Sequence, residues 1–361
     1  MFLSRLLLEN FRCYAALNQT FNTPISIIDG DNGSGKTALI EAIYWQSTGR
    51  SFRHHKSKQL IQHEQNQLSV FSEYISSDNG QSHKLGVGYT RDNKKTIKLN
   101  NQQIKSQTDI AQHFPVVSID PNAFLWIDHA PGFRRSYLDW LVFHVEPNYL
   151  PIWKKTQKIQ QHLNKLLKNG GLDELPLWQE KYSQLAEQTH QYRSAVVARI
   201  EQKFKQLAQY FLPHVNGLTI SYNKGWSSSD LFAELIQKQN IHLKQGFVGL
   251  GVNKADLICL NNNKSAHVIL SRGQKKLLAI IMYLVYIEIY EDKNNKSPVI
   301  CIDDIDSELD AHALALLAKY IQNKQRQIFI TTVNAYSIKP YFNESETFHV
   351  KQDNSNHAVL S

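Results

Sequence analysis

The sequence has few cysteines, and their positions exclude two common kinds of cysteine site. Cys13, Cys259 and Cys301 are scattered and odd in number, and no pair has the spacing of metal ligands. This usage argues against a disulfide framework and favours a reducing compartment. We therefore expect a cytoplasmic protein.

Signals for secretion, membrane insertion and repeats are also missing from the sequence. Arg5 and Glu9 come too early in the chain for the apolar core of a secretory signal. The longest apolar stretch, residues 277–290, is interrupted by Glu288 and is too short to span a bilayer. No internal repeat or low-complexity tract is visible. We expect a protein that is neither secreted nor embedded in a membrane.

Acidic residues are fewer than basic ones. The 361 residues include 40 Lys and Arg but 32 Asp and Glu, which gives a formal net charge of +8. Such an excess suits a polyanionic partner such as nucleic acid, because each neutralised phosphate releases counterions. A solvated surface with a slight lysine bias explains the same number, so charge alone leaves both interpretations open.

Apolar periodicity predicts an α/β protein with a helical insertion. Strand patterns cover residues 3–8 and 25–28, a helical pattern covers 37–46, and short strands are expected between 65 and 105. Two helical patterns follow, at 152–168 and at about 178–211, with Gly170-Gly171 between them. They predict an antiparallel hairpin, either an ordinary helical subdomain or a projecting arm.

The α/β pattern returns in the last third of the chain. A buried helix is predicted at 277–290, strands at 299–302 and 328–333, and a helix at 310–323. We therefore predict a head built from both chain ends, residues 1–135 and 246–361, with a mainly helical domain inserted at 136–245.

A glycine-rich segment between the second strand and the first helix carries the strongest chemical signal. It matches the phosphate-binding pattern G-x-x-x-x-G-K-[ST] in full. Glycines let consecutive N–H groups turn inward toward phosphate oxygens, and the following helix adds the positive end of its dipole. The lysine can reach the β- and γ-phosphates of ATP, and the threonine hydroxyl can ligate Mg²⁺. The predicted nucleotide-binding residues are Gly30, Asp31, Asn32, Gly33, Ser34, Gly35, Lys36 and Thr37.

Two aspartates follow the buried strand at 299–302. Asp303 is predicted to join Thr37 as a Mg²⁺ ligand, because the strand end delivers its carboxylate beside the phosphate-binding loop. Asp304 is predicted to orient or deprotonate the attacking water, with Lys36 as the second catalytic residue. Aspartate is one methylene shorter than glutamate, so slow hydrolysis is expected. Buried strands also end in aspartate for capping reasons alone.

A third motif precedes the helix at 277–290. Ser271 and Gln274 form a capping box, which explains both residues as structure. That box requires neither Arg272 nor Gly273, and glycine weakens a helix. The combination resembles the signature of ABC ATPases, which engages the γ-phosphate bound to the opposing subunit.

Two smaller segments fit the same set of motifs. Ser307 and Asp310, just past the aspartate pair, resemble the D-loop of ABC dimers, although an ordinary helix cap gives the same pattern. Thr332 ends the next strand, where ABC transporters usually place a switch histidine. A threonine hydroxyl would have to take over that role.

Motifs along most of the chain resemble those of the RecF family. They are the residues at 9–12, 30–37, 49–53, 134–139, 254–257, 270–275 and 303–310. In similar proteins the residue matching Arg12 lies near the bound nucleotide. The family usually has Gly-Pro-His where this chain departs from the pattern with Gly251-Val252-Asn253.

The resemblance implies an ABC-type P-loop ATPase head, ATP and Mg²⁺ as cofactors, and a role in DNA repair, replication restart and the SOS response. It implies an ATP-dependent homodimer that helps to load RecA at single-strand gaps with RecR and RecO. The expected DNA partners are duplexes and junctions of single and double strands. The candidate DNA contacts form a cationic segment that a solvated loop explains equally well: Arg50, Arg53, His54, His55, Lys56 and Lys58.

Two other classes of protein share the phosphate-binding loop. The ATP-binding subunit of a transporter needs a docking surface for membrane helices and normally keeps the switch histidine that is missing here. A small-molecule kinase has no use for a second signature acting from another subunit. Both remain alternatives to the DNA clamp at this stage.

Overall fold

The computed structural model describes residues 1–53, 56–77, 80–170, 173–322, 324–353 and 357–360. The chain divides into two compact units, residues 1–124 with 290–361 and residues 125–289, called the head and the arm unit below. Contacts group residues 246–289 with the arm unit, because β10 (Asp256–Asn261) pairs with β9 (Leu218–Asn223) there. The predicted boundaries at 135 and 245 therefore differ from this division.

The head contains an antiparallel sheet formed mainly by the N-terminal third of the chain. Its strand order is β2-β1-β4-β5-β6-β7, and every neighbouring pair is antiparallel. The predicted strand at 3–8 and the short strands between 65 and 105 lie in this sheet and are confirmed. The strands are β1 (Phe2–Phe11), β2 (Tyr14–Thr20), β4 (Gln67–Ile75), β5 (Ser82–Thr90), β6 (Lys95–Leu99) and β7 (Gln102–Gln103).

A second sheet in the head brings strands from both chain ends together. Its order is β15-β14-β3-β13-β12-β8, parallel from β14 to β8, with β15 antiparallel at one edge. The carboxyl ends of its parallel strands meet at one edge, which aligns the loops that follow β3, β12, β13 and β8. The strands are β3 (Ile25–Asp29), β8 (Val116–Ile119), β12 (Val299–Ile302), β13 (Ile328–Thr332), β14 (Ser345–Gln352) and β15 (Ala358–Leu360).

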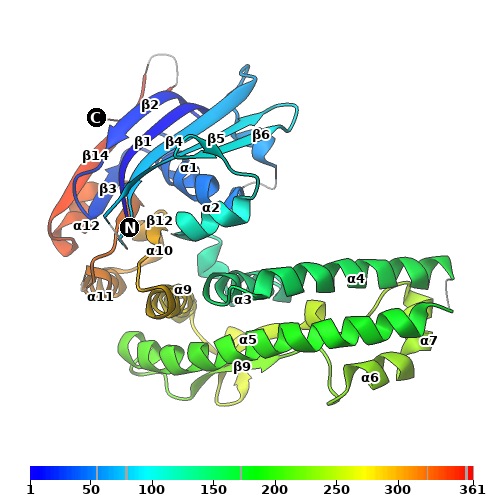
Figure 1. Ribbon diagram of the computed structural model, residues 1–361. Helices are drawn as coiled ribbons and strands as arrows, with labels where there is room; N and C mark the ends of the chain where they lie inside the picture. The colour runs from blue at the N-terminus through cyan, green and yellow to red at the C-terminus, as the bar shows by residue number, and fades with distance from the viewer. Residues whose placement is uncertain (54–55, 78–79, 171–172, 323, 354–356, 361) are drawn as a thin grey trace. The chain divides into compact units, whose positions relative to one another are not determined.

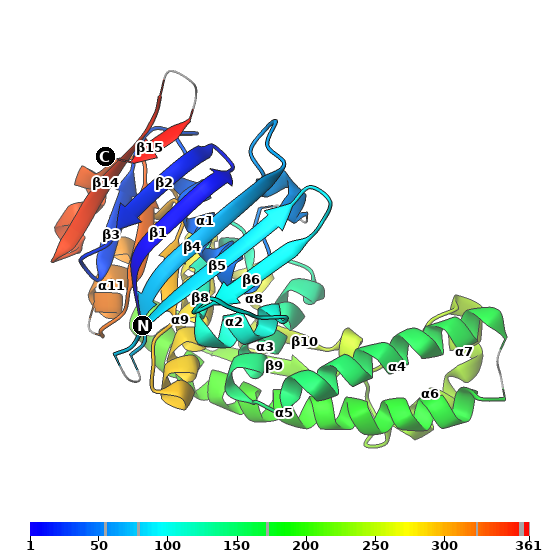
Figure 2. The same cartoon turned by 45° about the horizontal axis from the view of Figure 1, so that its top comes forward.

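Helix α1 (Lys36–Thr48) packs between the two sheets (Figure 2). Its Leu39, Ile40 and Ile43 are fully buried in one core with side chains from both sheets, such as Leu6 and Phe329. A helix covered on both sides has apolar residues all round, which suits this burial. The other head helices are α2 (Gln107–His113), α10 (Ile305–Glu308), α11 (Ala311–Gln322) and α12 (Ala335–Ile338), with short 3₁₀ turns at Ser57–Leu60 and Lys339–Tyr341.

The arm unit is built on two long helices, α4 (Tyr149–Asn169) and α5 (Leu175–Phe211), which lie side by side (Figure 1). This confirms the predicted hairpin. Gly170 ends α4 with a φ of +81°, a conformation that favours glycine, whereas Gly171 lies outside the described residues. The rest of the unit contains α3 (Pro131–Val145), α6 (Leu231–Gln237), α7 (Gln239–Gln245), α8 (Ala266–Ile269) and a three-stranded sheet of β9, β10 and β11 (Lys264–Ser265). Helix α9 (Arg272–Asn294) begins in the arm unit.

A buried ion pair ties the arm unit together. The Arg193 guanidinium of α5 donates to both carboxylate oxygens of Asp139 in α3, at 2.8 and 3.0 Å, and also to the Val252 carbonyl at 2.8 Å. Tyr149 and Trp153 of α4 donate to the same carboxylate. Three helices and the loop before β10 therefore share one network.

The loop that departs from the RecF pattern has its own contacts. The Asn253 side chain exchanges hydrogen bonds with Gln157 of α4, at 2.8 and 3.1 Å, and donates to Gln160. Gly251 has a φ of +96°, and a Cβ there would lie 2.1 Å from the Tyr182 hydroxyl. Asn253 thus fastens this loop to the first helix of the hairpin.

Among the described helices, none is long and apolar enough to cross a membrane.

Candidate nucleotide site

The glycine-rich loop follows β3 and depends on glycine at two positions. Gly30 and Gly35 have φ values of +145° and +121°. A Cβ at Gly30 would lie 2.4 Å from the Val350 carbonyl oxygen, and one at Gly35 would lie 2.8 Å from Cys13 Sγ. Both positions therefore require glycine for conformation and for space.

The polar groups of this loop suit a phosphate ligand. Helix α1 begins at Lys36 without a side-chain cap, so its first N–H groups have no partner within the helix. The Lys36 ammonium donates to the carbonyls of Gly30 and Asp31, at 2.7 and 3.0 Å, which holds it over the loop. The buried Ser34 hydroxyl has no hydrogen-bond partner in the described parts of the chain. The residues of the loop thus fit the phosphates of a nucleotide.

The predicted metal ligands meet at the carboxyl edge of the parallel sheet. The Thr37 hydroxyl donates to Asp303 Oδ1 at 3.0 Å, and the Thr331 hydroxyl donates to the same oxygen at 2.7 Å. The backbone N–H of Asp304 donates to Thr331 Oγ1 at 2.8 Å. A carboxylate and a hydroxyl in contact form a donor set that Mg²⁺ prefers.

A further carboxylate, which sequence reasoning missed, lies next to this pair. Asp120 follows β8, and the Asp303 N–H donates to the carbonyl of the preceding Ile119 at 2.9 Å. The pKa of Asp120 is raised to about 7, mainly by burial and also by the charge of Asp303, although backbone N–H donors act against the rise. Burial likewise raises the pKa of Asp303 to about 6. The four-residue strand Val-Val-Ser-Ile before Asp120 was the available signal.

Asp304 lies at the head of α10 with a left-handed backbone, φ +49° and ψ +47°. Burial raises the pKa of its carboxyl, the charge of Lys36 opposes the rise, and Asp306 and Glu308 add to it. A carboxylate with a raised pKa is a better proton acceptor near neutral pH. Its half-buried position at the sheet edge is compatible with the prediction that Asp304 orients or deprotonates the attacking water.

The residues predicted as switch and D-loop have different surroundings. Thr332 is fully buried, and its hydroxyl donates to Asp306 at 2.6 Å. The neighbouring Thr331 donates to Asp303 instead. Ser307 is exposed, with its hydroxyl on the Asp304 carbonyl at 2.8 Å. Asp310 is exposed as well, and its carboxylate accepts from the Ala313 N–H in the first turn of α11.

The predicted signature forms the exposed N-terminal end of α9 in the arm unit. The Ser271 N–H donates to Gln274 Oε1 at 2.9 Å and the Gln274 N–H donates to Ser271 Oγ at 3.3 Å, which confirms the capping box. Ser271, Arg272 and Gly273 are exposed, and a Cβ at Gly273 would meet nothing within 4 Å. The helix end is therefore open to an approaching group.

Comparisons with known proteins agree with this geometry. The family model described as the RecF/RecN/SMC N terminal domain matches residues 2–356. The DNA replication and repair protein RecF of Shewanella denitrificans is 33% identical over 98% of both chains. That of Vibrio vulnificus is also 33% identical, over 97% of this chain and 98% of its own. This chain belongs to the RecF family.

Solved structures extend the match to three dimensions. The recombination mediator protein RecF with ATP, from the RecFOR pathway, superposes with a TM-score of 0.86 at 26% identity, covering 100% of this chain and 97% of the other. An SMC head bound to the C-winged helix domain of ScpA gives 0.60 at 15% identity, covering 100% and 98%, which shows the fold alone. The predicted fold class, an ABC-type head with an inserted helical arm, is confirmed.

Arg12, the RecF-family position predicted near the nucleotide, is held against α1. Its guanidinium donates to both oxygens of the fully buried Glu41, at 3.0 and 2.9 Å, and to the Gln59 carbonyl at 3.3 Å. The Ser51 hydroxyl also donates to Glu41. Sequence reasoning missed Glu41, because a lone acidic residue in an apolar helix gives no sign of its distant partner.

The candidate DNA contacts that the structure describes lie on the surface, Lys58 among them. Arg50, Arg53 and Lys56 are exposed, whereas His54 and His55 lie outside the described residues. The positive charge of Arg53 opposes the rise in pKa that burial causes at both Asp303 and Asp304. Arg53 is therefore close enough to influence the nucleotide site as well as the surface.

Proposed function

We propose that this RecF-family chain is an ATP-dependent DNA clamp of recombinational repair and replication restart. The observation that carries the proposal is that one chain contains both parts of an ABC-type ATP site, each a half-site of the proposed dimer. A complete phosphate-binding loop lies beside the Thr37–Asp303 contact, and a capped, exposed helix end is presented separately at Ser271.

In this proposal the loop after β3 binds the triphosphate of ATP. Lys36 and the N–H groups at the start of α1 contact phosphate oxygens, and Ser34 donates its otherwise unpaired hydroxyl. Thr37 and Asp303 hold Mg²⁺, which neutralises phosphate charge when it is bound. Thr331 fixes the Asp303 carboxylate through its hydroxyl, so the ligand is oriented before the metal arrives.

Hydrolysis is proposed to be slow. Asp304 would orient or deprotonate the water, but its short side chain reaches less far than a glutamate from the same backbone position. A slow ATPase suits a switch whose ATP state must last.

Dimerisation is proposed to bring the second half-site. Ser271, Arg272, Gly273 and Gln274 of one copy would cover the γ-phosphate held by the other copy, with Ser307 and Asp310 at the same interface. Next to this helix end, Val268 is 79% exposed and Ile269 45% exposed. Exposed apolar side chains beside a polar cap are typical of a surface that a partner covers.

The biological partners follow from the family. DNA duplexes and single-strand/double-strand junctions would bind the ATP-bound dimer, and RecR, with RecO, would help it to load RecA at single-strand gaps in the cytoplasm. Contacts through lysine and arginine to phosphates give affinity without sequence reading. A preference for DNA structure over base sequence is therefore expected.

Retention on duplex DNA tests the proposal. Wild-type protein should bind an immobilised duplex in the presence of ATP and Mg²⁺ and be released with ADP. The Lys36→Ala variant should not be retained under either condition. Affinity should fall steeply with added salt, because phosphate contacts release counterions. Equal retention with ATP, with ADP and without nucleotide would contradict the ATP-dependent clamp.

A further inference from the structure

The net positive charge of this protein comes from one of its two units. The head, residues 1–124 and 290–361, contains 20 Lys and Arg and 20 Asp and Glu, so its formal charge is zero. The arm unit, residues 125–289, contains 20 basic and 12 acidic residues and therefore carries the whole excess of +8. The basic character seen in the sequence is a property of the arm unit.

Helix α4 concentrates this excess. Its 21 residues include five lysines and no aspartate or glutamate. All five lysines are exposed, and in the described parts of the chain none makes an ion pair. They are Lys154, Lys155, Lys158, Lys165 and Lys168. By contrast, α5 carries acidic and basic residues interspersed along its length.

Four of these lysines form a row, called the α4 lysine stripe below: Lys154, Lys158, Lys165 and Lys168. At 100° per residue they fall within an arc of about 80°, and at 1.5 Å per residue the row is about 21 Å long. The opposite side of the helix is buried, through Thr156, Gln160, Leu163 and Leu167. The stripe therefore runs along the side of α4 that faces away from its packing surface.

The α4 lysine stripe destabilises the helix on its own. Lys154 and Lys158 are four residues apart, and Lys165 and Lys168 are three apart, spacings at which like charges repel by about 0.2–0.5 kcal/mol per pair. No acidic residue stands in the first turn of α4, where one would be favourable. The aliphatic part of Lys168 packs near Gly246, where a Cβ would lie 3.2 Å from Lys168 Cγ.

We propose that the α4 lysine stripe binds the phosphate backbone of duplex DNA. The inference rests on the proposed DNA-clamp function and adds a binding surface in the arm unit. A polymer with one negative charge per about 1.7 Å of length matches a straight row of unpaired cations better than a compact ligand does. Phosphate contacts of this kind add affinity and positioning but no sequence preference.

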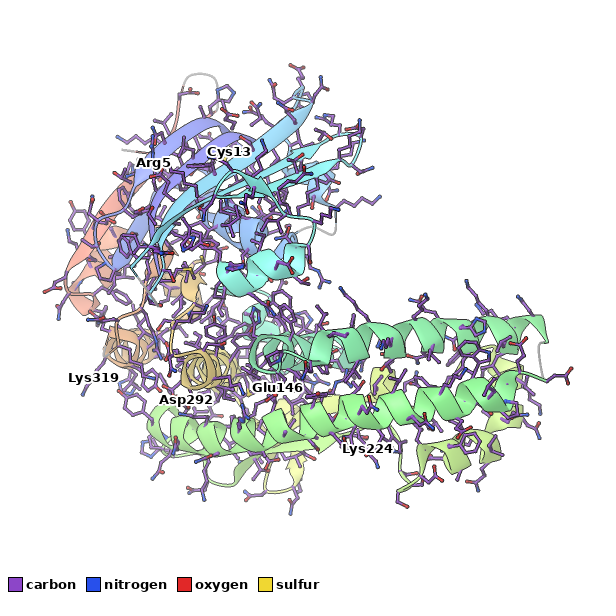
Figure 3. All side chains as sticks on the ribbon, in the orientation of Figure 1. Arg5, Cys13, Glu146, Lys224, Asp292 and Lys319 are labelled. Carbon is purple, nitrogen blue, oxygen red and sulfur yellow. The ribbon has the colours of Figure 1, made fainter. Side chains whose placement is uncertain are left out.

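Two variants with the same loss of charge test this assignment. The first replaces the stripe: Lys154→Gln, Lys158→Gln, Lys165→Gln and Lys168→Gln. The control replaces four exposed lysines of the head: Lys98→Gln, Lys105→Gln, Lys319→Gln and Lys339→Gln. Lys319 projects from α11 (Figure 3). A third variant replaces the stripe with arginine at all four positions, which keeps the charge.

Binding of a fluorescent duplex to the full-length variants is measured with ATP and Mg²⁺ over a range of salt. The stripe variant should bind at least tenfold more weakly near 0.15 M salt, and the magnitude of the slope of log K against log salt should fall by about 3.6, or about 0.9 for each of four lost contacts. The head control should keep wild-type affinity, and the arginine variant should restore it. Nucleotide binding, measured in parallel, should be the same in all variants.

Several outcomes would overturn the assignment. Equal weakening of the stripe variant and the head control would mean that net charge alone acts. Wild-type affinity in the stripe variant would remove α4 from the interface while leaving the DNA clamp intact. Loss of binding to a polyglutamate probe, with DNA binding unchanged, would assign the stripe to an acidic protein segment. A wild-type protein that fails to bind duplex DNA would contradict the clamp function itself.

Discussion

At the scale of single residues, the site depends on a few side chains whose partners come from distant parts of the sequence. Asp303 is held by Thr37 from the N-terminal part of the head and by Thr331 from the next strand. Lys36 is held by carbonyls of its own loop. The loop lysine is therefore already in place for a phosphate, while the aspartate is oriented for a metal.

Lys36→Ala is expected to raise the Kd for ATP by about 10- to 100-fold, since each charge-assisted hydrogen bond contributes about 1.5–3 kcal/mol. Isothermal titration with ATP and Mg²⁺ measures this effect. Lys319→Ala, an exposed lysine of the same unit, serves as the control and should bind ATP normally. A Kd for Lys36→Ala within twofold of wild type would exclude the lysine from the phosphate site.

Asp120→Asn is expected to stabilise the nucleotide-free protein at pH 8 but not at pH 4. The pKa of Asp120 is raised to about 7 in the folded protein, so the folded state holds a proton that the unfolded state has already lost. Stability is therefore lost as pH rises from about 4 to 7, and the loss is complete above pH 7. Removing the carboxylate should recover about 1–3 kcal/mol at pH 8.

Thermal unfolding of wild type and Asp120→Asn at the two pH values measures this difference. The variant should melt several degrees higher at pH 8, with nearly equal melting temperatures at pH 4. Ser118→Ala, on the same strand, controls for a general effect of mutating β8. A variant that is less stable at pH 8 would show that the Asp120 carboxylate is stabilising when ionised.

At the scale of helices and strands, apolar patterning predicted the elements with strong periodicity. The strand at 299–302 matches β12, and the long pattern near 178–211 matches α5 (Leu175–Phe211). The short strand β8 and the strands β14 and β15 were missed. Ser118 interrupts the apolar run of β8, and β14 (SETFHVKQ) is mostly polar, so local patterning did not identify them and only their pairing with distant strands does.

The same reason limits the prediction of the site. Residues 30–37 and 303–304 were identified, because local spacing alone defines their motifs. Asp120 and Glu41 were not, since each acquires its meaning from a partner far away in the sequence, Asp303 and Arg12 respectively. Thr332 stays a prediction as the switch residue, and the contact of its neighbour Thr331 with Asp303 is one that local spacing did not indicate.

The arm unit should depend on its buried ion pair. Arg193→Met leaves the Asp139 carboxylate without its guanidinium partner, and breaking a buried pair costs about 3–5 kcal/mol. The matched control is Arg199→Met on the same helix, because the Arg199 side chain is 43% exposed and its pair with Glu146 is 3.4 Å long. The control should lose less than about 1 kcal/mol.

Chemical denaturation followed by tryptophan fluorescence compares the two variants. A second substitution, Asp139→Leu in the Arg193→Met background, should recover part of the loss because it removes the unpaired charge. Equal stability of Arg193→Met and Arg199→Met would mean that the network on Asp139 contributes little to the arm unit.

At the scale of the whole molecule, a single copy lacks part of the proposed ATP site. The head supplies the phosphate-binding loop and the metal ligands, and the arm unit supplies an exposed capped helix end together with all of the excess positive charge. Neither part explains an ATP-dependent DNA clamp alone. In the proposed dimer, two copies joined through nucleotide would combine both functions.

Ser271→Arg is expected to separate nucleotide binding from dimerisation. The exposed serine leaves room for a large side chain in a single copy. Losing its cap on the Gln274 N–H costs about 1 kcal/mol, which is too little to unfold the protein, so ATP affinity should be unchanged. In the dimer the arginine would occupy the space of the γ-phosphate and block pairing. Ser337→Arg, at an exposed site on α12, is the control and should dimerise normally.

The most direct measurement is the molar mass of the wild-type protein in solution, by light scattering after size exclusion. With saturating ATP and Mg²⁺ we expect a dimer of about twice 41.6 kDa, and with ADP or without nucleotide we expect a monomer. Lys36→Ala and Ser271→Arg should stay monomeric in all three conditions. A wild-type protein that remains monomeric under saturating ATP and Mg²⁺ would contradict the account.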